Sequence, residues 1–252
     1  FRMDRIYSQM GYAFAKHIFG IKGSYAVDPQ KGAVVMTLTT QGDAPIHYTL
    51  DGSEPTAASP RYTGPVEIGK SARFRATALR EGGENASYSR EFAFSKSTGR
   101  PAVLNTKPND SYTFEGASLL VDGYHSRPVF TSGAWLGYLD EPLDVTIDMG
   151  GEQSYRSVEL ETLAEKGDWI FPPSSVTVWV SDNGTDFTEV ASVTVPEAKA
   201  GDADGIGRYR MQFPETSARY LKVVAQNAAA IPAWHPGAGS KGFLFVDEIV
   251  VE

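Results

Sequence analysis

Apolar and polar residues alternate with a period of two along much of the chain, which predicts β-strands. In AVVMTLTT and again in IHYTL every second residue is apolar, so that Ile46, Tyr48 and Leu50 share one face. The segment ARFRATALR repeats the alternation, with a small apolar face and an arginine-bearing face. An Asp-Gly turn and a Pro/Ser-rich loop separate these segments. We therefore expect residues 24–95 to fold as a small all-β sandwich.

A second series of strand segments follows the polar, glycine-containing stretch SKSTGR, which marks a domain boundary near residue 95. The segments are LDVTIDM, SVELETL, SVTVWVS, TEVASVTV, RYRMQF, RYLKVVAQ and FLFVDEIVV. Strands separated by turn-rich loops predict a larger β-sandwich or jelly roll over residues 96–252. Trp135 and Trp179 lie in or beside these patterns, and we expect both in the core.

The N-terminal segment has a different period. Apolar residues recur at spacings of three and four from Met3 to Ala13 and are followed by Gly20, which predicts a short helix and makes residues 1–23 a helical tail with a linker. The segment has no initiator methionine and no uninterrupted apolar stretch of the kind found in signal peptides. We expect the chain to be a fragment of a longer protein, without a transmembrane segment.

The composition limits the kinds of molecule that the chain can bind and the chemistry that it can carry. With 23 basic and 31 acidic side chains the formal net charge is −8. No segment gathers lysine and arginine in the way that binding to a phosphate backbone requires, so nucleic acid is not expected as a partner. The absence of cysteine excludes disulfides, thiolate nucleophiles and cysteine-ligated zinc.

Catalytic motifs are missing from the sequence. The 4 histidines lack the spacing of a zinc hydrolase, and no nucleophile elbow, P-loop or dinucleotide fingerprint occurs. A glycosidase can use two carboxylates, but Asp140-Glu141 precedes a proline in a loop and Asp247-Glu248 lies inside the last strand segment. We expect these dipeptides to be non-catalytic and the fragment not to be an enzyme.

Aromatic residues in two polar loops of the second half suggest binding instead. Trp169 lies in WIFPP, and Trp234 and His235 lie in IPAWHPG. An exposed ring offers a flat apolar face to a sugar, while neighbouring polar groups bind its hydroxyls. Alternatively, both tryptophans plug the ends of the sandwich. The segment VDGYHSRP forms either a polar rim of such a site or a solvated turn.

Two stretches resemble known families. IHYTLDGSEPTAASPRYTGPVEI, followed by ARFRATALREGGENAS, resembles the small immunoglobulin-like domain near the C-terminus of chitobiases and β-hexosaminidases. SSVTVWVSDNGTDFTEV, followed by ARYLKVVAQN and FLFVDEIVVE, resembles the coagulation factor V/VIII type C, or discoidin, fold, which includes the family-32 carbohydrate-binding modules. The segment RMDRIYSQMGYAFAKHIF is similar to the tail that follows the catalytic barrel in family-20 glycoside hydrolases of gut Bacteroidetes.

The resemblance implies a fold class and a function. It implies an all-β chain, with an immunoglobulin-like sandwich followed by a discoidin-like jelly roll. It also implies a parent β-N-acetylhexosaminidase whose catalytic barrel lies upstream, in the periplasm or on the surface of a bacterium. This fragment would then bind host or dietary glycans containing N-acetylhexosamine or galactose-type sugars. The alternative is that it braces the barrel or its dimer without binding sugar.

The resemblance also implies site residues. Galactose-binding discoidin modules carry an arginine and an asparagine before the V-x-V-S strand, where this chain has Lys166, Asp168 and Trp169 instead, a departure from the galactose pattern. Several members bind a structural Ca²⁺ near a D-G turn with a glutamate close to the C-terminus. Asp122 and Glu248 match those positions, and carbonyl and hydroxyl oxygens would complete the shell that Ca²⁺ prefers.

Overall fold

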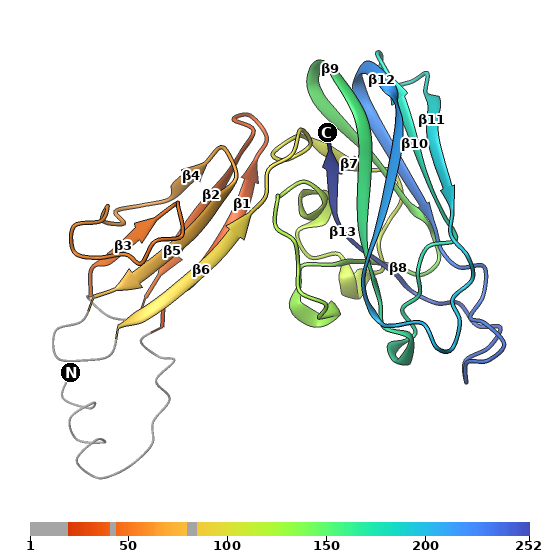
Figure 1. Cartoon of the computed structure of the whole chain (residues 1–252), viewed down its shortest axis with the longest axis horizontal. Helices are drawn as coiled ribbons and strands as arrows, with labels where there is room; N and C mark the ends of the chain where they lie inside the picture. The colour runs from red at the N-terminus through yellow and green to blue at the C-terminus, as the bar shows by residue number, and fades with distance from the viewer. Residues whose placement is uncertain (1–19, 41–43, 80–84) are drawn as a thin grey trace, which may run out of the picture. The chain divides into compact units, whose positions relative to one another are not determined.

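A computed structural model describes residues 20–40, 44–79 and 85–252 (Figure 1). The helix expected near the N-terminus lies outside the described residues. The chain separates into two compact units, with residues 35–68 in the first and Phe92–Glu252 in the second. The domain boundary expected near residue 95 stays a prediction.

The first part of the chain forms two three-stranded sheets, ordered β1-β2-β4 and β3-β5-β6. The strands are β1 (Lys22–Asp28), β2 (Ala33–Thr39), β3 (Ile46–Thr49), β4 (Val66–Ile68), β5 (Ala72–Ala78) and β6 (Ala86–Phe92). The period-2 alternation holds in β2, where Val34, Met36 and Leu38 are buried. In β5 the ring of Phe74 is buried and stacks on Tyr48 with ring centroids 5.7 Å apart.

The second unit contains one seven-stranded sheet in the order β11-β10-β12-β9-β13-β8, with β7 paired to β9. Its strands are β7 (Ala102–Leu104), β8 (Leu136–Tyr138), β9 (Leu143–Ala164), β10 (Ser175–Ser181), β11 (Thr188–Thr194), β12 (Gly205–Gln226) and β13 (Leu244–Val251). Four short 3₁₀ helices lie between them: η2 (Asp110–Tyr112), η3 (Gly116–Leu120), η4 (Phe130–Ser132) and η5 (Lys166–Asp168). The all-β prediction is confirmed. Among the described residues no helix is long and apolar enough to cross a membrane.

Two strands of 22 residues each, β9 and β12, take part in two layers of this sheet, one with β7, β10 and β11 and one with β8 and β13 (Figure 1). The first part of β9 pairs with β7 and with the end of β12, whereas its last part pairs with β13 and with the start of β12. The sequence predicts four separate strands here. The ladder instead continues past Gly150, which takes a φ of +79°, and past an irregularity between Gln212 and Thr216.

Of Trp135 and Trp179, only Trp135 lies in the core of the second unit. Trp135 has no exposed surface, and its indole N–H donates to the Arg127 carbonyl at 3.0 Å. Trp179 is only half-buried, so the expectation that it lies in the core is wrong. The reason is strand phase, because Val176, Val178 and Val180 point inward from β10 and the residue between two of them must point outward.

The strand register places three loops at one end of the second unit. At this end β9 stops and β12 starts, since Ala164 pairs with Gly205. The start of β10 is held at this end by the preceding loop, in which Ile170 bridges to Glu165 and to Phe243. Ser175 in turn pairs with Thr194 at the end of β11 and with Gln226 at the end of β12. Consequently the loops 165–174, 195–204 and 227–243 meet; they are called the aromatic end below.

Candidate functional site

Trp169 stands at the tip of the first loop in a left-handed backbone conformation. It follows η5 with a φ of 64°, and its N–H donates to the Lys166 carbonyl at 3.0 Å. Its side chain is 43% exposed. The six-membered ring packs on Gly237, where an added Cβ would lie 2.8 Å from Cζ2 of Trp169. The glycine therefore permits close approach of the indole to the third loop.

His235 is the centre of the aromatic end. Its Nδ1 accepts from the Gly237 N–H at 3.0 Å, so Nε2 carries the proton and donates to the Lys166 carbonyl at 2.9 Å. The imidazole meets Trp169 edge-on with ring centroids 6.1 Å apart, and meets Trp234 and Phe171 in the same way at 5.5 Å each. Both ring nitrogens are engaged, so His235 positions the aromatic side chains around it.

Trp234 completes the group of rings. It is 39% exposed, and its indole N–H donates to the Ala198 carbonyl at 2.9 Å, which ties the third loop to the second. Its ring lies 6.3 Å from that of buried Phe171. The structure thus brings together Trp169, Trp234 and His235, the aromatic residues identified from the sequence.

The polar candidates in the first loop differ in their surroundings. Lys166 is buried, and its ammonium pairs with Asp204, whose pKa it lowers. Its charge is therefore already neutralised within the protein. Asp168 is exposed beside Trp169. Desolvation raises the pKa of Glu165, and the nearby carboxylates of Asp168 and Asp204 add to the rise.

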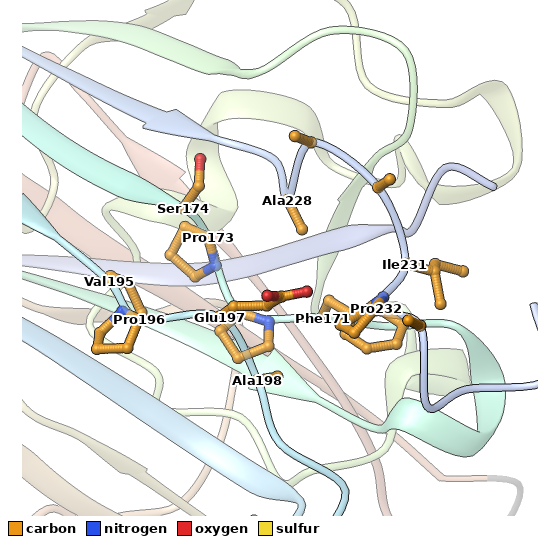
Figure 2. Close-up of a pocket in the computed structure, with 14 residues that line it drawn as sticks. Phe171, Pro173, Ser174, Val195, Pro196, Glu197, Ala198, Ala228, Ile231 and Pro232 are labelled. Atoms are coloured by element: carbon orange, nitrogen blue, oxygen red, sulfur yellow. The ribbon is translucent and has the colours of Figure 1, made fainter. Parts of the chain in front are cut away.

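A pocket of about 390 Å³ adjoins Trp234 through Phe171 and Ala198. Figure 2 shows this pocket and the residues that line it. It lies between the three loops and includes Phe171 and Ala198, which contact Trp234, together with Ala233, which precedes it. Prolines and alanines provide most of its wall, and Glu197 is its single charged residue. This pocket is not predicted by the sequence. Its signal is the spread of proline and alanine over three distant loops, which only the fold brings together.

The two residues expected to hold Ca²⁺ also come together. Glu248 accepts from the Gly123 N–H at 3.1 Å through Oε2, and Asp122 accepts from the Tyr124 N–H at 2.7 Å. Both side chains are buried, and Glu248 Oε1 has no hydrogen-bond partner in the part of the chain that the structure describes. Burial raises the pKa of Glu248 well above its ordinary value, and the carboxylates of Asp122 and Asp247 add to the rise.

A bulge in β13 explains the placement of these acids. Val246 pairs with Thr162 and Ile249 with Leu160, so Asp247 and Glu248 together oppose the single residue Glu161 of β9. The extra residue turns side chains that would otherwise alternate. Asp247 accepts from the Ser126 N–H at 2.7 Å, which holds the segment after the Asp-Gly turn against the strand.

The buried Glu161 has cationic neighbours of its own. Its carboxylate lies 2.9 Å from Nδ1 of His125 and 2.5 Å from Nε of Arg208. Burial acts to raise the pKa of Glu161, but His125 and Arg208 hold it below its ordinary value. No such cation is among the groups that shift the pKa of Glu248, whose Oε1 has no hydrogen-bond partner among the described residues.

These two acids fit a hard cation. Oxygen donors and an unpartnered buried carboxylate oxygen are what Ca²⁺ requires, with backbone oxygens completing the shell. Over residues 20–40, 44–79 and 85–252, no group of three or more His, Asp or Glu side chains could hold a metal ion. Any ion between Asp122 and Glu248 would thus depend on carbonyl or hydroxyl oxygens for its other ligands.

Comparisons with known families cover most of the chain. A model of the chitobiase/β-hexosaminidase C-terminal domain matches residues 25–90. A model of the F5/8 type C domain matches residues 105–241, more than half of the chain. A comparison with curated proteins finds no match.

Several solved structures are similar at low sequence identity. A chitosan-binding module of a chitosanase/glucanase from Paenibacillus sp. IK-5 is 18% identical, with 63% of this chain and 98% of that one covered and a TM-score of 0.41. The module CpGH89CBM32-5 from Clostridium perfringens, in complex with GalNAc-β-1,3-galactose, is 16% identical over 60% and 94% of the two chains, with a TM-score of 0.41. CBM32-3 of a family 31 glycoside hydrolase from Clostridium perfringens is 16% identical over 64% and 94%, with a TM-score of 0.40.

Proposed function

Because the chain belongs to the F5/8 type C domain family, we propose that it is a non-catalytic carbohydrate-binding region. One observation carries the proposal: two tryptophans, 43% and 39% exposed, converge on His235 beside an open pocket. Half-exposed indoles in a loop cluster provide stacking faces for a sugar ring. The ligand is a glycan that contains N-acetylhexosamine or galactose-type sugars.

The proposal also concerns the longer protein to which this region belongs. The chitobiase/β-hexosaminidase C-terminal domain over residues 25–90 supports a parent β-N-acetylhexosaminidase with its catalytic domain upstream. Such an enzyme would act on host or dietary glycans in the periplasm or on the surface of a bacterium of the Bacteroidetes. The region would then hold the enzyme near its polymer and raise the effective concentration of substrate.

A structural Ca²⁺ between Asp122 and Glu248 is also proposed. The unpartnered Oε1 of Glu248 supports it. The ion would neutralise two buried carboxylates and fix the Asp-Gly turn against β13. Its role is stability rather than chemistry, since neither residue lies in the loops of the aromatic end.

A bracing role is the second candidate, and specific contacts favour it. The Trp234 N–H is satisfied by Ala198, and Trp169 packs on Gly237, so both rings also serve the fold. In that case the exposed faces would meet the parent enzyme and not a glycan. The two roles predict different effects on glycan binding when the tryptophans are replaced.

Trp169→Ala and Trp234→Ala are each expected to weaken glycan binding about 2- to 10-fold, since a stacking contact contributes about 0.5–1.5 kcal/mol. Wild-type affinity should be near millimolar, about −4 kcal/mol. Titration with N-acetylated and galactose-containing oligosaccharides measures the change, with the melting temperature followed in parallel. Trp179→Ala is the matched control, because it removes a half-buried indole from the middle of β10 and should leave binding unchanged.

Unchanged binding in both tryptophan variants, or loss of folding in both, would contradict the carbohydrate-binding proposal and favour bracing.

The chain is expected not to hydrolyse an aryl N-acetylglucosaminide. Asp140 pairs with Lys241 at 2.6 Å, and Glu141 accepts from the Lys107 N–H at 2.9 Å, both on the exposed surface. Asp247 and Glu248 are buried. Asp140 and Glu141 do line a pocket of about 220 Å³, but their carboxylates are held there by Lys241 and by the Lys107 N–H. Release of the aryl group measures this, and turnover that disappears when one carboxylate is replaced would show that the expectation is wrong.

A further inference from the structure

Glu197 is the only charged residue in the wall of the pocket beside Trp234. Figure 2 shows its carboxylate amid the lining side chains, between Pro196 and Phe171. It makes no ion pair or hydrogen bond with any residue in the described part of the chain, and it is exposed to solvent. No lysine or arginine lines the pocket. A ligand in the pocket would therefore meet one unpaired negative charge in apolar surroundings.

The side chains that line the pocket determine which ligands can bind beside the Glu197 carboxylate. Phe171, Ile231 and the prolines and alanines around them offer few polar groups. A neutral ligand would displace water from the Glu197 carboxylate and leave its charge poorly compensated, which is costly. A ligand with a positive charge would replace that water with a charge-assisted hydrogen bond.

The charges near the pocket favour a cation as well. Lys166, a buried cation of the neighbouring loop, is already paired with Asp204. Asp168 and Glu165 at the Trp169 side add negative charge. The three loops together carry five carboxylates against Lys166, Lys199 and Lys241, so their net negative charge attracts a cationic ligand.

We propose that this pocket binds the protonated amine of a hexosamine whose amino group is free, with Glu197 as its acceptor and Trp234 beside the adjoining sugar ring. The proposal rests on the carbohydrate-binding function proposed above and gives it a specificity. An acetamido group in the same place has no charge to offer Glu197. A polymer in which some hexosamines have free amines could place an amine in the pocket and sugar rings against the tryptophans.

The test compares the binding of glucosamine hexamer and N-acetylglucosamine hexamer to the full chain by calorimetry at low salt. Wild type is expected to prefer the glucosamine hexamer. Glu197→Gln should weaken binding of that hexamer about tenfold or more, since a hydrogen bond between charged groups is worth about twice a neutral one. The same substitution should change binding of the N-acetylated hexamer little. The preference of wild type should shrink as salt is added.

Three further variants separate the pocket from general effects. Glu189→Gln removes the same charge from an exposed position on β11 outside the pocket and should bind like wild type. Ala228→Leu fills the pocket without changing charge and should weaken binding of the glucosamine hexamer, whereas Ala200→Leu, an exposed alanine outside it, should not.

Equal weakening by Glu197→Gln and Glu189→Gln, or a wild-type preference for the N-acetylated hexamer, would overturn the assignment of the pocket. Binding of galactose-containing or N-acetylated oligosaccharides without any response to the Glu197 or Ala228 substitution would overturn it while leaving the carbohydrate-binding function in place. Failure of wild type to bind any of these sugars would overturn both.

Discussion

Removal of calcium with EDTA is expected to lower the melting temperature by about 10 °C, because a ligand at about 1,000 times its Kd contributes about 4 kcal/mol and each kcal/mol is worth about 2–4 °C in a unit of this size. The physical reason is the pair Asp122 and Glu248, which are 2% and 0% exposed. Without a cation, two buried carboxylates face each other and one oxygen of Glu248 stays unpartnered. Differential scanning calorimetry with and without EDTA measures the shift.

The calcium experiment has two controls. Adding Ca²⁺ back should restore the melting temperature, whereas Mg²⁺ should restore less, because it demands a smaller octahedral shell. Glu248→Gln should remove the response to EDTA, while Glu189→Gln on the surface should keep it. An unchanged melting temperature in EDTA, together with no heat of Ca²⁺ binding, would show that the site does not exist.

Trp135→Ala is expected to lower the free energy of unfolding by about 3–5 kcal/mol, the usual cost of removing a fully buried tryptophan. The side chain has no exposed surface and belongs to a cluster with Leu163, Ile170 and Phe245. Its indole N–H is also hydrogen-bonded, so the substitution leaves the Arg127 carbonyl without that donor. Urea denaturation gives the change in free energy.

Trp179→Ala is the matched comparison. The residue is half-buried on the outer side of β10, so its loss should cost only about 1 kcal/mol. A similar loss of stability in the two variants would contradict the assignment of Trp135 to the interior and Trp179 to the outside. Trp135→Phe guards against a variant that fails to fold, since it keeps most of the volume and should cost less than Trp135→Ala.

Local patterns predicted the strands well because alternation is a property of neighbouring residues. The buried faces of β2 and β5 follow directly from it. The same reasoning placed Trp179 inside, although its phase relative to Val178 in SVTVWVS puts it on the opposite face. It also divided β9 and β12, since Gly150 and Pro214 are ordinary turn signals and only the partner strand shows that pairing continues across them.

The sequence predicted which residue types form the candidate site, but it did not predict the pocket between the loops. Exposed tryptophans in polar loops are visible in the sequence, and the strand order brings those loops to one end. The pocket with Glu197 was not predicted, because three loops that are separated in sequence by whole strands supply only a few small side chains each to it. The opposition of Glu161 to Asp247 and Glu248 was equally hidden, since a bulge depends on the register between two strands.

The passage of β9 and β12 through both layers has a thermodynamic consequence. The two layers share these strands and also enclose one hydrophobic core, so separating them would expose that core to water. The second unit should therefore melt in a single cooperative transition with no stable half-open form. The loops of the aromatic end are anchored on β9, β10, β11 and β12, so glycan binding should be lost no later than this transition.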